Sequence, residues 1–203
     1  MGLMKYFIEQ SIKPEGVIGR IMLKIMNNTH KSLFQLGLSN INLDENCKLL
    51  DLACGGGNFL KIASKKHKNI KLFGIDFSKE AIRIASKNNK KDIHNGKIRL
   101  LQGDIGKIPF TDNYFHVITA FQTHFHWEDL SDKIKEIYRV LNENGQFIIV
   151  AEKYKVNYHM EKYKTENDIK ELFDKAGFEN IEYKETKDNM FITGVKIIPV
   201  SRE

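Results

Sequence analysis

The residues with the clearest chemical potential lie in the segment LLDLACGGGNFL, residues 49–60, where an aspartate precedes three consecutive glycines. The pattern predicts a buried strand ending at Asp51, a tight turn through residues 55–57 and a helix that begins at Asn58. Because glycine has no Cβ and tolerates positive φ, the main chain of such a turn can approach a ligand closely. In parallel sheets ligands bind beyond the carboxyl ends of the strands, which is where this turn would lie. The segment therefore predicts a ligand-binding loop.

The residues of this loop indicate which ligands it suits. A dinucleotide fingerprint would place another glycine three residues after Gly57, where the chain has Leu60, and no Gly-Lys-Ser/Thr sequence follows as in a P-loop. The Asp51 carboxylate would repel a pyrophosphate and attract an ammonium or sulfonium group. We therefore expect a cationic nucleoside ligand.

Two further aspartates follow the next two predicted strands. Asp76 ends a strand about 20 residues after the glycine loop, where a carboxylate can accept hydrogen bonds from both ribose hydroxyls. Asp104 follows the third strand in LLQGDIGKIPF and could accept a hydrogen bond from an adenine amino group. One such aspartate is as often a loop cap. Three at successive strand ends indicate a nucleoside-binding site.

These residues require a particular order of strands and helices. Near-continuous apolar runs, as expected for strands covered on both faces, alternate with segments of helical spacing from residue 47 onward. The predicted strands are 47–53, 70–76, 97–103, 114–121 and 145–152. The predicted helices are 58–67, 79–91 and 129–141, with Ser78 and Ser131 as caps, and 166–176. FENIEYKE and MFITGVKIIPV, which follow the last helix, are predicted to be antiparallel neighbours because only a turn separates them.

The alternation predicts an α/β fold with a Rossmann-like, doubly wound, mostly parallel sheet of seven strands whose last strand is antiparallel. Residues 16–26 and 28–37 have helical spacing, the second stretch stopping at a glycine, and are expected to cover the sheet as an N-terminal helical cap. We expect one domain, 1–203, made of this cap over residues 1–40 and an α/β core over residues 41–203.

Composition and charge disfavour several classes of protein. The chain has 203 residues, 41% of them hydrophobic, two cysteines and no apolar run near the roughly 20 residues of a membrane span, so we expect a cytoplasmic globular protein. The net charge of +6 is concentrated in residues 61–97, which hold 11 basic and 3 acidic residues. Lys79, Arg83 and Lys87 recur as on the solvated face of a helix, and no aromatic residues alternate with these cations as in a single-strand binding groove. We expect a monomer or homodimer that binds a small molecule, with nucleic acid the less favoured partner.

Five motifs, in order along the chain, resemble those of the class I S-adenosylmethionine-dependent methyltransferases, in particular their small-molecule type 11/25 branch. LLDLACGGG is similar to the family's Asp-x-Gly-x-Gly-x-Gly loop, with Ala53 in place of the first glycine. GIDFSKEAI is similar to the acidic segment that follows. GDIGKIPFTDNYFHVI is similar to a Gly-Asp…Leu-Pro-Phe…Phe-Asp-x-Val signature, with His116 in place of an aspartate. RVLNENGQFIIV and LFDKAGFENIE resemble the later strand entry and the final helix–strand step.

The resemblance implies S-adenosylmethionine as cofactor and assigns ten positions of the core to it. These positions are Asp51, Ala53, Gly55 and Gly57 around the methionine part, Asp76 at the ribose, Phe77, Ile105 and Asp104 at the adenine, and Phe121 and Gln122 beside the sulfonium and the acceptor. Arg20, on the predicted N-terminal helix, is a further candidate for the cofactor carboxylate, the alternative being an exposed helix cation.

The segment FQTHFHWEDL follows the fourth predicted strand, in the position of the acceptor pocket. It lacks the Asn/Asp-Pro-Pro-Tyr/Phe element with which DNA amino-methyltransferases grip a flipped base, so a small-molecule acceptor is favoured. His124 or His126 could remove a proton from an oxygen or nitrogen nucleophile. The alternative is that both are polar loop histidines without chemistry.

The sequence leaves three alternatives to this assignment open. The chain could be a non-catalytic S-adenosylmethionine-binding regulatory module, an RNA methyltransferase or an NAD-dependent oxidoreductase. The cluster of residues 153–163, with Tyr154, Tyr158, His159 and Tyr163, would form either the other wall of the acceptor pocket or an exposed amphipathic helix. His30, His67 and His94 lie in polar contexts, and no role is expected of them.

Overall fold

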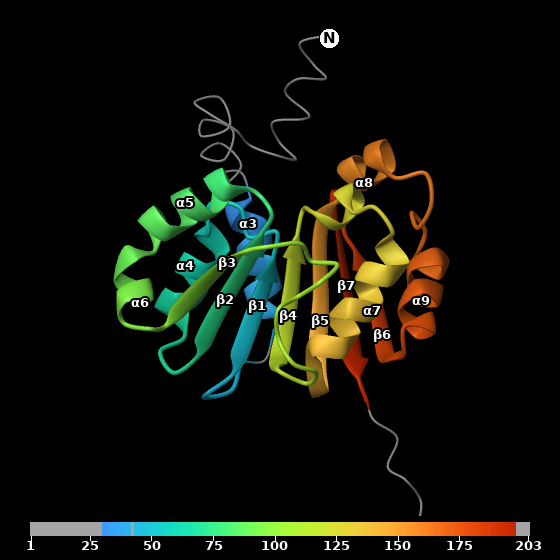
Figure 1. The fold of residues 1–203 in the computed structure, drawn as a ribbon. Helices are drawn as coiled ribbons and strands as arrows, with labels where there is room; N and C mark the ends of the chain where they lie inside the picture. Colours follow the sequence, from blue (N-terminus) through green and yellow to red (C-terminus); the bar gives the residue numbers. More distant parts are fainter. Residues whose placement is uncertain (1–29, 42, 198–203) are drawn as a thin grey trace, which may run out of the picture.

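The structure, a computed structural model, describes residues 30–41 and 43–197 (Figure 1). The predicted helix at 16–26 and Arg20 lie outside these residues. The strands are β1 (Lys48–Leu52), β2 (Lys71–Asp76), β3 (Ile98–Gln102), β4 (Phe115–Phe121), β5 (Leu141–Glu152), β6 (Phe178–Glu185) and β7 (Asn189–Lys196). The helices are α3 (Lys31–Ser39), α4 (Asn58–Lys66), α5 (Lys79–Asn88), α6 (Lys90–His94), α7 (Leu130–Val140), α8 (Lys153–His159), α9 (Glu166–Lys175) and the short 3-10 helix η1 (His124–His126).

All seven strands belong to one sheet in the order β3-β2-β1-β4-β5-β7-β6. Strands β1 to β5 are parallel, and β7 lies antiparallel between β5 and β6. The predicted seven-stranded, mostly parallel sheet with an antiparallel last strand is therefore confirmed. The strand order reverses between β1 and β4, and doubly wound sheets bind their ligands at the carboxyl ends of strands beside such a reversal.

Helices cover both faces of the sheet (Figure 1). On one face α3 and α4 pack through Phe34 and Phe59, whose ring centroids lie 5.8 Å apart. On the opposite face α7 and α9 pack through Ile137 and Phe173, both of them fully buried. Each large apolar side chain buried in this way contributes roughly 1.5–3 kcal/mol to folding. None of the helices in the described part of the chain is long and apolar enough to cross a membrane.

Two predicted helices end at other residues than expected, one because of a glycine and one because of an asparagine side chain. The stretch expected at 28–37 is α3, and Gly37 lies inside it rather than at its end. A Cβ at Gly37 would lie 2.5 Å from the Phe121 ring, so this glycine lets α3 approach β4. The helix expected at 79–91 is divided into α5 and α6, since Asn89 ends α5 by donating side-chain hydrogen bonds to the carbonyls of Gly57 and Ala85.

The two predicted helix caps have different outcomes. Ser78 caps α5, because its Oγ accepts a hydrogen bond of 3.2 Å from the N–H of Ala81, as predicted. The prediction for Ser131 is wrong. The chain enters α7 through Asp129 in the left-handed conformation, so Ser131 is already the second residue of the helix.

Candidate functional site

A cavity of about 410 Å³ lies where the carboxyl ends of β1, β2 and β4 meet. This volume lies within the range typical of small-molecule sites. Of the ten core positions expected to contact the cofactor, nine line the cavity: Asp51, Ala53, Gly55, Asp76, Phe77, Asp104, Ile105, Phe121 and Gln122. His126 lines it as well, whereas Gly57 and His124 do not.

Three residues with positive φ shape the glycine loop. Ala53, Gly55 and Gly57 have φ values of 49°, 52° and 70°. A Cβ on Gly57 would lie 2.6 Å from Nδ2 of Asn89 and 2.9 Å from Cβ of Ala85, so both conformation and space require glycine there. Gly57 therefore fits the loop against α5, while the residues before it face the cavity.

Asp51 supplies a deeply buried carboxyl group to the cavity wall. Its side chain is 3% exposed, and its Oδ1 accepts a hydrogen bond of 2.9 Å from the hydroxyl of Thr119. Burial raises the pKa of Asp51 to about 8; the Thr119 hydroxyl opposes this rise and the nearby Asp76 adds to it. A cation in the cavity would favour the ionised form of this group.

Asp76 both fixes the loop and lines the cavity. Its two carboxylate oxygens accept hydrogen bonds of 2.9 Å from the main-chain N–H groups of Gly55 and Ser78. Burial raises the pKa of Asp76, and these two hydrogen bonds oppose the rise. Each carboxylate oxygen can accept a further hydrogen bond. The capping and ligand-binding interpretations of this aspartate are thus compatible.

Apolar side chains flank the cavity near Asp104. Ile105 is buried, whereas Phe77 is 44% exposed, although both line the cavity. Asp104 accepts a hydrogen bond of 2.8 Å from the N–H of Gly106, which closes a turn around its carboxylate. Apolar surface beside a hydrogen-bond acceptor suits a flat base that carries an amino group.

The two candidate catalytic histidines lie in different surroundings. Burial, with His159 and Lys155 nearby, lowers the pKa of His126 to about 4 at the cavity wall. His124 is fully buried, which lowers its pKa to about 3, and neither of its ring nitrogens has a hydrogen-bond partner among the described residues. It lines a second cavity of about 450 Å³, together with His159 and Tyr163. The structure therefore brings His126, and not His124, to the cavity beside the glycine loop.

His30, for which no role was predicted from the sequence, also lines the cavity beside the glycine loop. Its Nε2 lies 3.2 Å from Nζ of Lys155, and burial lowers its pKa to about 4, with Lys155 contributing. An ammonium group only donates hydrogen bonds, so Nε2 of His30 is the unprotonated nitrogen and Nδ1 carries the hydrogen. The ring of Phe34, one helical turn later, lies edge-on to His30 at 6.2 Å. The spacing of four residues between the two is the sequence signal that could have pointed to His30.

A chain of polar contacts continues from His30 to the ends of β4 and β5. Lys155 forms an ion pair of 2.7 Å with Glu152. Nε2 of Gln122 donates to Glu152 at 2.6 Å, and the N–H of Glu152 donates back to Gln122 at 3.1 Å. Tyr154 and Tyr158, which are 64% and 71% exposed, form no part of either cavity, so the exposed-helix alternative is correct for them.

Comparison with known proteins identifies the family. A model of the family described as "Methyltransferase domain" matches residues 50–149, which hold the glycine loop, Asp76 and Asp104. The chain belongs to the class I S-adenosylmethionine-dependent methyltransferases. The matched residues, 50–149, include every position of the core that was predicted to bind the cofactor.

Two relatives by sequence carry methyltransferase names. YrhH of Bacillus subtilis (strain 168), a methyltransferase by name, is 33% identical over 119 residues, which cover 59% of this chain and 65% of YrhH. The ubiquinone/menaquinone biosynthesis C-methyltransferase UbiE of Geotalea daltonii is 30% identical over 121 residues, which cover 59% of this chain and 52% of UbiE. The match thus spans less than two thirds of either relative.

Two solved structures share the fold of this methyltransferase. Phosphoethanolamine N-methyltransferase 2 of Haemonchus contortus, in complex with S-adenosyl-L-methionine, superposes with a TM-score of 0.72 at 15% identity, covering 83% of this chain and 53% of that chain. The [4+2]-cyclase SpnF superposes with a TM-score of 0.71 at 18% identity, covering 82% and 80%. At such identities the likeness concerns the fold alone.

Proposed function

We propose that the chain is an enzyme that transfers a methyl group from S-adenosylmethionine to a small-molecule acceptor. The observation that carries the proposal is the meeting of Asp51, Asp76 and Asp104 around one cavity beside the glycine loop. Their chemistry matches the cofactor, which presents an ammonium and a sulfonium group, two ribose hydroxyls and an adenine amino group. Membership of the family supports the same activity.

The chain's own residues would bind and align the two reactants. When bound, S-adenosylmethionine supplies a methyl group that its sulfonium already activates. Asp51 and the main chain of the loop would hold the amino-acid part, Asp76 the ribose, and Phe77 with Ile105 the adenine. Alignment in a water-poor cavity lowers the barrier, by up to roughly 7–11 kcal/mol for well-oriented groups.

We propose that the acceptor binds beside Gln122, His126 and His30, all of which line the cavity. Burial keeps both imidazoles neutral at pH 7, so each ring offers one donor and one acceptor nitrogen. Taking up a proton would create a buried cation, which the low pKa of about 4 shows to be unfavourable. His126 would therefore hydrogen-bond the acceptor, and the site favours a nucleophile that needs little deprotonation, such as a neutral amine or a thiolate.

SpnF, an enzyme named as a cyclase, shares the fold, so the fold alone does not require methyl transfer. In the alternative, the chain is a regulatory module that binds the cofactor without transferring its methyl group. Incubation with S-adenosylmethionine carrying a deuterated methyl group, followed by mass spectrometry of a cell extract separated into small molecules and RNA, distinguishes the two. We expect the deuterated methyl group in a small molecule, together with S-adenosylhomocysteine, and at least tenfold less of both with Asp76→Asn. Binding without any S-adenosylhomocysteine would support the alternative, and label in RNA would contradict a small-molecule acceptor.

A further inference from the structure

The loop between β3 and β4 carries two of the residues that line the cavity. Asp104 and Ile105 lie near its start, and it continues without helix or strand to residue 114. A segment of this kind keeps one shape only where its main-chain polar groups find fixed partners. The N–H groups of Asn113 and Tyr114 bind the carbonyls of Arg139 and Val140. In the middle of the loop the partners include two side chains of α7.

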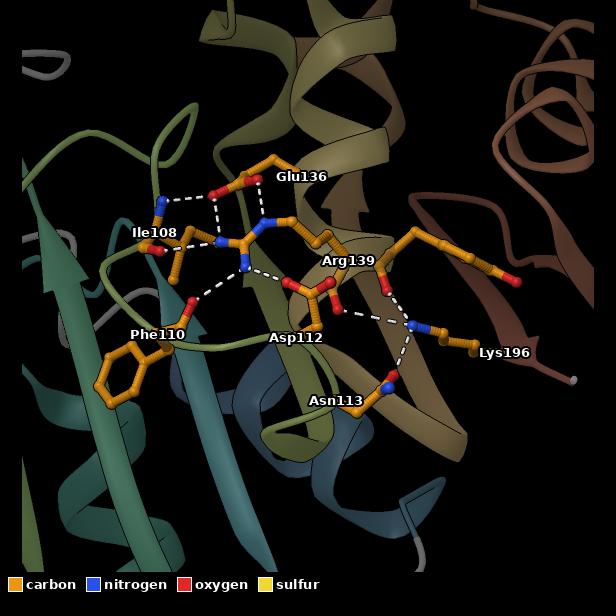
Figure 2. Close-up of polar contacts among 8 residues, drawn as sticks. Ile108, Phe110, Asp112, Asn113, Glu136, Arg139 and Lys196 are labelled. Carbon is orange, nitrogen blue, oxygen red and sulfur yellow. Dashed lines mark hydrogen bonds and ion pairs between the residues drawn. The ribbon is translucent and has the colours of Figure 1, made fainter.

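The guanidinium group of Arg139 binds the loop with its full set of donors (Figure 2). It donates to the carbonyl of Ile108 at 3.1 Å, to the carbonyl of Phe110 at 3.0 Å and to the carboxylate of Asp112 at 2.7 Å. Two further bonds of 2.8 Å reach the two carboxylate oxygens of Glu136. A guanidinium group has five N–H donors, so these five hydrogen bonds use all of them.

Glu136 completes the attachment from the same face of α7. Its Oε1 accepts a hydrogen bond of 2.7 Å from the N–H of Ile108, so both main-chain polar groups of Ile108 are held by α7 (Figure 2). The hydrogen bonds from Arg139 lower the pKa of Glu136 and keep it ionised. Charge-assisted, two-pronged pairs of this kind are among the strongest polar contacts in proteins.

The fixed position of Ile108 is passed on to Asp104 through a short turn. The N–H of Lys107 donates to the carbonyl of Asp104 at 3.1 Å, and the N–H of Gly106 donates to its carboxylate at 2.8 Å. Anchoring the loop at Ile108 therefore also fixes where the carboxylate of Asp104 lies. Lys133, one helical turn before Glu136, lines the cavity itself.

We propose that Glu136 and Arg139 are positioning residues for the cofactor, holding the β3–β4 loop so that Asp104 and Ile105 face the bound adenine. The inference rests on the proposed function, because the shape of the loop matters to binding only if the cavity takes an adenine nucleoside. If loss of Arg139 leaves the loop in its binding shape one tenth of the time, the apparent affinity falls about tenfold.

Lys196 offers a matched control in the same part of the molecule (Figure 2). Its Nζ donates to Oδ1 of Asn113 at 2.7 Å and to the carbonyl of Tyr138 at 2.8 Å, and its side chain is buried. It therefore ties β7 to the end of α7, where it also reaches the carbonyl of Arg139 at 3.5 Å, and to Asn113 near the end of the loop, without contacting residues 108–112 or the cavity. Replacing Lys196 removes a buried cation and its bond to Asn113, while the bonds of Arg139 and Glu136 to residues 108–112 stay in place.

Calorimetric titration with S-adenosylhomocysteine, together with thermal unfolding, tests the proposal. We expect Arg139→Met to weaken binding roughly 10- to 100-fold. Lys196→Met should lower the unfolding temperature but stay within about twofold of the wild-type affinity. Wild-type affinity in Arg139→Met, or equal losses in both variants, would overturn the proposal. If the wild-type chain itself does not bind S-adenosylhomocysteine, that result contradicts the proposed function, on which the positioning proposal rests.

Two further variants separate positioning from general stability. In a double-mutant cycle with Asp104→Ala, Arg139→Met should cost clearly less than it does alone, because its effect passes through that side chain. If the two substitutions instead lower the affinity independently, so that the fold-losses multiply in the double variant, the proposal is overturned. Should Arg139→Met not fold, the near-isosteric Glu136→Gln takes its place, with an expected loss of about 3- to 10-fold. Unchanged affinity in that variant would contradict the proposal equally.

Discussion

The hydroxyl of Thr119 on β4 donates a hydrogen bond of 2.9 Å to Oδ1 of Asp51 on the adjacent strand β1. The bond favours the ionised carboxylate, whereas burial favours the neutral acid, and burial has the larger effect because the pKa of Asp51 is raised to about 8. Asp51 is therefore mostly protonated at pH 7 when the cavity holds no cation.

We predict that S-adenosylmethionine binding releases a proton from Asp51 below about pH 8. A neighbouring cation stabilises the carboxylate, so the affinity should rise with pH, by at most about tenfold per unit, and level off above pH 8. Calorimetry in two buffers of different ionisation enthalpy counts the released proton. In Asp51→Asn the release should vanish, and in Thr119→Val the profile should move to higher pH. A wild-type affinity that does not change between pH 6 and pH 8 would contradict this account.

We predict a larger loss of stability in Gly57→Ala than in Gly96→Ala. Both glycines have similar positive φ values, +70° and +67°, so both substitutions carry a conformational cost of roughly 1–2 kcal/mol. A Cβ on Gly57 would also lie 2.6 Å from Asn89, whereas nothing lies within 4 Å of one on Gly96. Urea unfolding measures the difference, and equal losses would show that the loop does not depend on close packing against α5.

His124 is expected to weaken the folded state in acid. Its pKa is about 3 in the folded chain and about 6.5 when unfolded, so only the unfolded state binds this proton between those values. Stability from this group is present above pH 6.5 and is lost as the pH falls toward 3. We predict that His124→Leu is as stable as the wild type or more so at pH 7, with a shallower loss between pH 6.5 and 4. An unchanged slope in His124→Leu would contradict the prediction.

Once an acceptor is identified, we predict that His126→Leu raises KM for it while kcat falls by less than about tenfold. The reason is that a buried imidazole with a pKa of about 4 serves as a hydrogen-bond partner rather than as a strong base. Steady-state kinetics of His124→Leu and His126→Leu, measured side by side, check this. If kcat instead fell by roughly two powers of ten or more while the cofactor affinity stayed unchanged, His126 would be established as a general base.

Much of the cavity wall could be predicted from the sequence because parallel strands end at one edge of the sheet. That rule alone places Asp51, Asp76 and Asp104 together, and the structure shows all three lining one cavity. His30 could not be found in this way, since its place depends on how α3 lies against Phe121, and Gly37 allows that contact. From spacing alone, Gly37 was predicted to end the helix, whereas it lies inside α3.

The contacts of α7 with the β3–β4 loop could not be predicted from the sequence for a related reason. Glu136 and Arg139 fall on the polar side of an amphipathic helix, where charged residues usually face solvent. Only the structure shows that the β3–β4 loop covers this side and directs its carbonyl groups at the guanidinium. His124 shows the opposite case: the residues around it in the sequence suggested a place in the cavity wall, whereas the turn of η1 buries it away from that cavity.

Calorimetric titration of the wild-type chain with S-adenosylmethionine and with NAD, beside Asp76→Asn, tests the central claim most directly. The account predicts binding of S-adenosylmethionine and none of NAD. It also predicts an affinity about 30- to 1000-fold lower in Asp76→Asn, equivalent to the roughly 2–4 kcal/mol of two hydrogen bonds to a carboxylate. Tight binding of NAD with none of S-adenosylmethionine would contradict it.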